Sequence, residues 1–204
     1  MPVIDCPTEK LILDTAMRVF FAEGRINATT QDIADTAGVN RTLINYYFRS
    51  KKALIATAVK KTQTEFIRNA DLILSSTLPF RVKTERFIDD FLRNQYKYPF
   101  LESFLMVEFT NQRLKKNGST RFSKKQPAPV KQYLTEIKNE MDEGRIPKYN
   151  PSHFLLNMFS LMIYPVIMKP VQMSMCNLNE KEYQEILNER EQIIMNILFP
   201  PAFK

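Results

Sequence analysis

Two short helix patterns separated by a glycine turn constrain this chain more than any other feature. Thr29 and Asp32 have the spacing of a capping box, and the apolar residues that follow end two turns later at Gly38. Asn40 is a good N-cap for the next helix, which we expect over Arg41–Tyr47. Two short helices joined by a tight turn that contains glycine are typical of a helix-turn-helix.

A helix before this pair and one after it complete the pattern. Apolar residues at helical spacing predict a first helix over Glu9–Glu23, which Gly24 ends. Ser50 is suited to cap a fourth helix. The residues that we expect on the inner side of the helix-turn-helix are Ile33, Ala34, Ala37, Val39, Ile44 and Phe48.

The outer face of the third helix is then left with side chains that can read DNA bases, because Arg pairs with guanine and Asn with adenine. These base-reading candidates are Arg41, Thr42, Asn45 and Tyr46. Residues 36–64 contain six Lys or Arg and no Asp or Glu, in a chain of net charge +7. Lys51 and Lys52 stand in the first turn of the fourth helix, where the helix dipole disfavours cations unless a phosphate binds there. For the charge alone, a solvated basic face remains the alternative.

These motifs resemble the DNA-binding domain of the tetracycline-repressor (TetR) family over about residues 8–55. The matching segments are Thr29–Ala34, Ala37–Asn40, Ile44–Phe48 and Ser50–Lys51. The resemblance implies a homodimer whose third helices enter successive major grooves of a pseudo-palindromic double-stranded DNA operator. It also implies a regulator of transcription, usually a repressor that a small inducer releases.

The resemblance assigns phosphate contacts around the base-reading helix. The phosphate-contacting residues that it implies are Thr29, Thr30, Tyr47 and Lys51. We add Lys52, which follows Lys51 in the first turn of the fourth helix. Asn45 stands where many relatives carry an aromatic residue, and Lys52 where many carry Glu. For Tyr47, packing in the core under the first helix is the alternative.

The rest of the chain predicts an all-α fold, because only 4 glycines occur in 204 residues. Together with the first three helices, amphipathic patterns separated by proline or glycine give about nine helices. The later ones are expected at 51–75, 82–97, 100–116, 128–143, 152–174 and 180–198. We expect a DNA-binding domain over 1–50 and a ligand-binding and dimerisation domain over 51–204.

In the family the last two helices usually form the dimer interface, and apolar stripes here are consistent with that. The interface candidates are Phe154, Leu155, Phe159, Ile186, Ile193, Ile194 and Ile197. A ligand cavity is expected among the middle helices, where aromatic and thioether side chains suit an apolar or amphipathic molecule. The pocket candidates are Phe66, Phe87, Phe91, Phe104, Met106, Phe109, Met158 and Met162. Plain core packing is the alternative for both sets.

Other functions have less support. His153 is the only histidine, no Cys/His cluster has metal spacing and no glycine-rich phosphate loop occurs, so we expect no enzyme, metal or cofactor. An enzyme built on clustered carboxylates and a TetR-fold protein acting on nucleoid or division partners are the alternatives to a transcription regulator.

The surroundings of the protein are also predicted. Cys6 and Cys176 lie far apart and no signal peptide pattern opens the chain, which favours the bacterial cytoplasm, with association to the nucleoid when DNA is bound. The most apolar stretch, Phe154–Met168, is too short to cross a membrane. The basic segment 113–131 is expected to be a solvated connector, with steering of an anionic ligand or DNA as the alternative.

Overall fold

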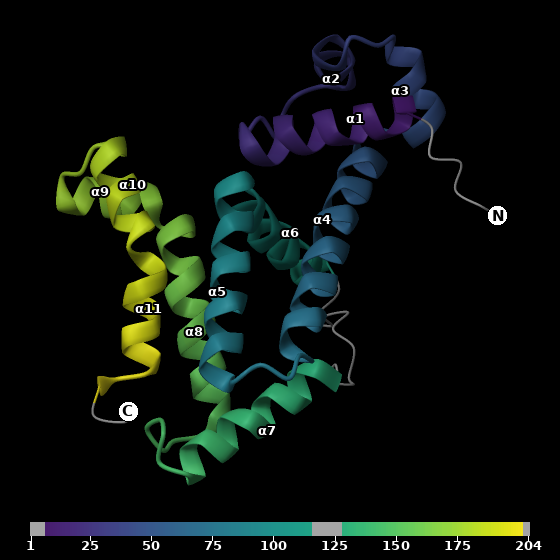
Figure 1. Ribbon diagram of the computed structural model, residues 1–204. Helices are drawn as coiled ribbons and strands as arrows, with labels where there is room; N and C mark the ends of the chain where they lie inside the picture. The colour runs from purple at the N-terminus through teal and green to yellow at the C-terminus, as the bar shows by residue number, and fades with distance from the viewer. Residues whose placement is uncertain (1–6, 116–127, 202–204) are drawn as a thin grey trace. The chain divides into compact units, whose positions relative to one another are not determined.

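The computed structural model describes residues 7–115, with side chains up to residue 108, and residues 128–201. These residues form eleven α-helices and one π-helical turn, so the all-α prediction is confirmed (Figure 1). Contacts divide the chain into two units. Unit 1 contains the described residues up to Ile67 together with Gln95–Leu105, and unit 2 contains Arg68–Asn94 and the described residues from Met106 on. The domain boundary predicted after residue 50 stays a prediction.

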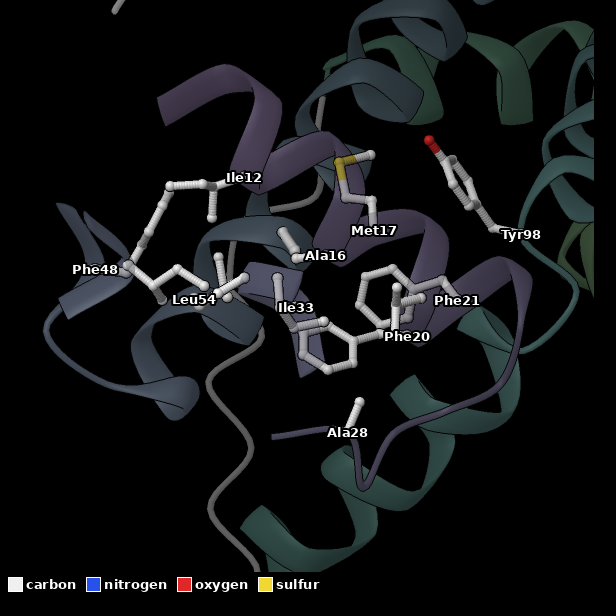
Figure 2. Packing of buried hydrophobic residues seen from close by; sticks show 14 of the residues in the cluster. Ile12, Ala16, Met17, Phe20, Phe21, Ala28, Ile33, Phe48, Leu54 and Tyr98 are labelled. Carbon is white, nitrogen blue, oxygen red and sulfur yellow. The ribbon is translucent and has the colours of Figure 1, made fainter. Parts of the chain in front are cut away.

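Unit 1 is built on a core shared by its first helices, of which Ile12, Ala16, Ile33 and Ile44 are completely buried members. Figure 2 shows side chains of this cluster. Its elements are α1 (Pro7–Met17), the π-helical turn η1 (Arg18–Ala22), α2 (Thr30–Ala37), α3 (Arg41–Phe48) and the part of α4 (Lys51–Leu74) that ends at Ile67. Since α1 and η1 are continuous, they form the helix predicted over Glu9–Glu23.

A segment distant in sequence completes this core. It contains the end of α5 (Phe80–Lys97) and the start of α6 (Leu101–Lys115), and it buries Tyr98 among the residues of Figure 2. The backbone N–H of Phe100 donates to the carbonyl of Phe21 at 3.0 Å. Gly24 has a φ of +70°, and a Cβ there would lie 3.0 Å from the Phe100 ring. Glycine is therefore required both by the backbone conformation and by the ring beside it.

Unit 2 adds α7 (Ala128–Asp142), α8 (Pro151–Ile167), α9 (Lys169–Cys176), α10 (Glu180–Asn188) and α11 (Arg190–Leu198) to its parts of α4, α5 and α6. Helix α8 packs against α7 and α11. The rings of Phe80, Phe154 and Phe199 lie within 5.9 Å of one another, centroid to centroid. Next to them, the buried Lys83 ammonium is paired with Glu136 of α7 at 2.7 Å, which joins α5 to α7.

The count of about nine helices was too low because two predicted helices are each divided. The helix expected over 152–174 is broken at Met168, where α8 and α9 form a bend of 74°. Pro170 in the first turn of α9 explains this break, because proline has no N–H and disfavours a helical conformation in the residue before it. The helix expected over 180–198 is broken at Glu189, where neither proline nor glycine marks the place.

Side chains of α10 and α11 compensate for the proline inside α8. Pro165 cannot donate to the carbonyl of Leu161, four residues earlier, which leaves that acceptor without its helical partner. The Arg190 guanidinium donates to this carbonyl instead, through Nη2 at 2.9 Å and Nε at 3.3 Å. The Tyr183 hydroxyl donates to the carbonyl of Pro165 itself at 2.6 Å. The divided C-terminal helices are thus held by hydrogen bonds between elements.

A helix that crosses a bilayer needs about 20 mostly apolar residues. No single helix in residues 7–115 and 128–201 is long and apolar enough, and only the bent pair α8 and α9 reaches that length when taken together.

Candidate nucleic-acid interface

The capping box predicted at the start of α2 is present. The Thr29 hydroxyl oxygen accepts from the Asp32 backbone N–H at 3.1 Å, and the Asp32 carboxylate accepts from the Thr29 backbone N–H at 2.7 Å. The Thr29 backbone N–H, and after it the Thr29 hydroxyl that also donates to this carboxylate at 2.9 Å, lower the pKa of the Asp32 carboxyl, because they favour its charged form. The first turn of α2 is therefore held by two reciprocal bonds at an exposed position.

The outer face of α3 carries the four candidate base readers, all exposed: Arg41, Thr42, Asn45 and Tyr46. Ile44 and Phe48 point the other way and are buried in the core of unit 1. The Asn40 side chain caps the helix by accepting from the backbone N–H of Thr42 at 2.9 Å and from its hydroxyl at 2.8 Å. The predicted division into inner and outer residues is therefore present, while base contact itself stays a prediction.

A hydrogen bond joins the starts of α2 and α3. Arg41 Nε donates to the hydroxyl oxygen of Thr30 at 3.2 Å. The structure thus brings a predicted base reader and a predicted phosphate contact together, although they are separated by a turn and most of α2. A guanidinium held at this place has further N–H groups that point away from the bond.

The start of α4 is basic, as expected. The Ser50 hydroxyl accepts from the backbone N–H of Ala53 at 3.1 Å, and the first turn contains no acid. Lys51 is half-buried with its ammonium 5.9 Å from the centre of the Phe20 ring, and Lys52 is exposed. The aromatic ring restrains Lys51 beside the free N–H groups of the helix start, which is an arrangement that suits a phosphate.

Two residues refine the predicted site. Arg49, at the end of α3, is exposed with a φ of +61°, and it adds a positive charge between the base-reading helix and Lys51. It was not among the predicted contacts, although it stands in the acid-free stretch that signalled this surface. Tyr47 is half-buried against the core, and its ring packs edge-on to Tyr46 with 5.0 Å between centroids. Part of the Tyr47 side chain therefore packs in the core, as the alternative for this residue predicts.

Comparison with known families decides the identity of this helix-turn-helix. The family model described as bacterial regulatory proteins of the tetR family matches residues 12–58, from the first helix to the start of α4. Residues 12–58 therefore match the DNA-binding domain of the TetR family. The match agrees with the predicted DNA-binding transcription regulator.

Individual relatives agree with this family. The HTH-type transcriptional regulator BetI of Agrobacterium fabrum is 34% identical over 61 residues, which are 30% of this chain and 30% of that protein. Among solved structures, the TetR-family regulator PfmR of Thermus thermophilus is 13% identical with a TM-score of 0.56, over 90% of this chain and 93% of that one. The fatty acid degradation regulator FadR of Bacillus halodurans is 18% identical with a TM-score of 0.55, over 94% and 96%. These structures show a shared fold over nearly the whole chain.

The predicted pocket residues are divided between the two units. Phe66 and Phe104 belong to unit 1 and are half-buried, whereas Met106 is 52% exposed and so does not line an enclosed cavity here. The side chain of Phe109 and the basic residues of segment 113–131 before Lys131 lie outside the described side chains, as does Cys6. The buried candidates, all in unit 2, are Phe87, Phe91, Met158 and Met162.

The predicted dimer residues also divide by burial. Phe154 and Ile194 are completely buried in the chain's own core, which is the alternative left open for them, and the dimer contact itself stays a prediction. Leu155 and Phe159 are half-buried, and Phe159 packs against the rings of the pocket candidates Phe87 and Phe91. Exposed apolar side chains remain on α8, α10 and α11, and two of them, Leu156 and Tyr164, were not among the predicted interface residues. The exposed residues are Leu156, Tyr164, Ile186, Ile193 and Ile197.

Proposed function

We propose that this chain is a dimeric TetR-family repressor that binds a pseudo-palindromic DNA operator through α3 and leaves it when a small molecule binds to its later helices. The observation that carries the proposal is the exposed face of α3, where Arg41 and Asn45 stand next to a basic helix start. Buried Ile44 and Phe48 fix the orientation of that face. A rigid helix with base-reading side chains outside and apolar ones inside suits the major groove.

Two kinds of contact with DNA are proposed, namely contacts that read bases and contacts that bind phosphates. Asn45 and Arg41 are the readers, because each can make paired hydrogen bonds with one base. Lys51, Thr29 and Tyr47 are the anchors, because phosphate contacts set the position of the protein without selecting a sequence.

Selection of bound DNA from a random pool, followed by titrations at several salt concentrations, tests this division. Asn45→Ala is expected to lose about 1–3 kcal/mol of discrimination at one base pair in each half-site. Lys51→Ala is expected to weaken binding to every sequence and to reduce the salt slope by about one. Lys181→Ala, which removes an exposed charge on α10, serves as the control and should change neither. If no sequence is enriched, or if Asn45→Ala and Lys51→Ala behave alike, the proposal fails.

The exposed apolar residues of α8 and α11 support the dimer. Leu156 is 60% exposed and Ile197 53% exposed, and such side chains are usually buried in a partner interface when they gather on neighbouring helices. Ile197→Glu should therefore give a folded monomer in sedimentation equilibrium. Leu72→Glu, at a more exposed apolar position on α4, should leave the dimer intact.

The ligand part of the proposal rests on the family and on the apolar lining of unit 2. Phe87, Phe91, Met158 and Met162 are aromatic or thioether side chains that adapt to varied apolar shapes. FadR is named for fatty acid degradation, but at 18% identity it shares the fold and supplies no ligand for this chain. An amphipathic effector is the class that these side chains fit.

A further inference from the structure

A hydrogen bond between two side chains links α2 and α3 at their first residues. Arg41 Nε donates to the hydroxyl oxygen of Thr30 at 3.2 Å. Thr30 is the first residue of α2, and Arg41 is the first residue of α3. Thr30 is half-buried and Arg41 is exposed, so the bond lies on the surface that carries the base readers.

The backbone before each of these two residues is fixed by a cap. The residue before Thr30 is Thr29, whose capping box holds the first turn of α2. The residue before Arg41 is Asn40, which caps α3 at the backbone N–H of Thr42. The hydrogen bond therefore spans two backbone positions that are already in place. What it restrains is the long side chain of Arg41.

The guanidinium of Arg41 has most of its donors left for another partner. Within the described residues it forms no ion pair and no second hydrogen bond. The acid in the first turn of α2, Asp32, accepts from Thr29 instead. With Nε–H bonded to Thr30, the N–H groups of Nη1 and Nη2 remain, and a pair of them can contact the O6 and N7 atoms of a guanine. A side chain that is restrained beforehand also loses less conformational entropy on binding.

We propose that Thr30 determines base specificity by holding Arg41 in the orientation in which Nη1 and Nη2 read a guanine. The inference rests on the proposed function and deepens it, because it adds a positioning residue to the base-reading surface. Thr30 acts through Arg41 and needs no contact with a base. Its hydroxyl accepts from Arg41 and keeps its own O–H for a phosphate oxygen, so this role adds to the predicted phosphate contact. A simple anchor, in contrast, sets the position of the protein without selecting a sequence.

A purely structural role for this bond has less physical support. A hydrogen bond with an exposed guanidinium exchanges with water, so its net contribution to folding is small. The core beneath α2 and α3 contains Ile33, Ala34 and Ile44, which are completely buried. The placement of the two helices thus depends on apolar packing, whereas the orientation of the guanidinium depends on Thr30.

Selection of bound DNA from a random pool by the full chain identifies the operator and the base pair that each reader selects. Arg41→Ala should remove a guanine preference at one position in each half-site, and Asn45→Ala a preference at another. Discrimination is the ratio of the dissociation constants for an operator changed at that position and for the natural operator. Thr30→Val should reduce discrimination at the Arg41 position about two- to tenfold, which is the range for one hydrogen bond. Discrimination at the Asn45 position should stay unchanged.

Two matched variants control for the substitution itself. Thr30→Ser retains the hydroxyl and should keep the discrimination of the natural chain. Thr64→Val removes an exposed hydroxyl of α4 that donates to the Lys60 carbonyl at 2.7 Å, and it should change discrimination at neither position. Thr30 follows the cap of α2 and valine has a similar helix propensity, so Thr30→Val should unfold at about the same temperature as the natural chain.

Four outcomes overturn the proposal. They are that Arg41→Ala removes no guanine preference, that Thr30→Val leaves discrimination at the Arg41 position unchanged, that it reduces discrimination equally at the Asn45 position, or that Thr30→Ser loses as much as Thr30→Val. If the natural chain enriches no sequence, the proposed function fails together with this inference. If an operator is enriched and Asn45→Ala relaxes it while Thr30→Val weakens all sequences alike, only the role of Thr30 is wrong.

Discussion

The helices of the DNA-binding face and the helices α8–α11 differ at some of their boundaries. Helices α8 and α10 also begin at local caps, Asn150 and Asn179, but the breaks that begin α9 and α11 have no side-chain cap. In the first region the boundaries coincide with local signals, namely the Thr29 box, Gly38 in a left-handed conformation and the Asn40 cap. In the second, the breaks at Met168 and Glu189 adjoin hydrogen bonds between elements, made by Arg190 and other side chains. Local capping is sufficient where helices are short and separated by turns. The break at Met168 has a local cause in Pro170, whereas no local signal marks Glu189 and the division there depends on contacts with other helices.

The two regions also differ in what they leave on the surface. The face of α3 exposes polar and basic residues, including Arg41 and Asn45, while its apolar residues are inside. Helices α8 and α11 expose Leu156 and Ile197 although they have a buried core of their own. The first surface suits a polyanion and the second suits another apolar surface.

The largest expected effect tests whether the stability of the N-terminal region depends only on residues close in sequence or also on distant ones. Gly24→Ala should destabilise the protein by about 2–4 kcal/mol, because its left-handed backbone and the nearby Phe100 ring both oppose a methyl group. Gly38→Ala has a similar φ with no atom within 4 Å of the added carbon, and should cost about 1–2 kcal/mol. Chemical denaturation measures both. Equal losses would mean that the Phe100 ring moves aside and that this region is local.

The next effect tests the repair of α8. Arg190→Leu should lower the free energy of unfolding by about 1–3 kcal/mol, since the Leu161 carbonyl loses its donor. In a Pro165→Ala background the backbone N–H returns to that carbonyl, so the same substitution should cost less than half as much. A double-mutant cycle from urea unfolding measures the coupling. Equal costs in both backgrounds would show that Arg190 stabilises the C-terminal helices by other contacts.

A smaller effect concerns a purely local cap. Thr29→Ala should destabilise by about 1 kcal/mol, because the Asp32 N–H loses its acceptor. Thr29→Ser retains the hydroxyl and should stay within a few tenths of a kcal/mol of the natural chain. Thermal and urea unfolding of the two variants provide the measurement. A loss as large in Thr29→Ser would point to the methyl group in place of the cap.

The smallest effect is a dependence on pH. The pKa of Asp32 is lower in the folded chain than in the unfolded one, so its stabilisation is present at neutral pH and is lost as pH falls through the folded value. Glu102 has the opposite sign, because its raised pKa makes the fold less stable as pH rises through that value. Asp32→Asn should therefore flatten the acid side of the stability profile. Glu102→Gln should remove a loss of stability at higher pH.

Much of the DNA-binding region followed from sequence alone. The capping box at Thr29, the cap at Asn40 and the outward position of Asn45 all depend on residues within a few positions of each other. Short-range hydrogen bonds and a period of 3.6 residues depend on residues close in sequence and can therefore be predicted from it. The resemblance to the family also rests on the sequence alone.

Only the tertiary structure decided features that depend on contacts between distant segments. Apolar periodicity treats Phe154 and Ile197 alike, yet the first is buried in the chain and the second is exposed. Likewise, nothing near Gln95 in the sequence shows that its amide is buried without a partner, or that its segment packs with the N-terminal core. Periodicity shows that one face of a helix is apolar, but burial and hydrogen bonding depend on which other helix covers that face.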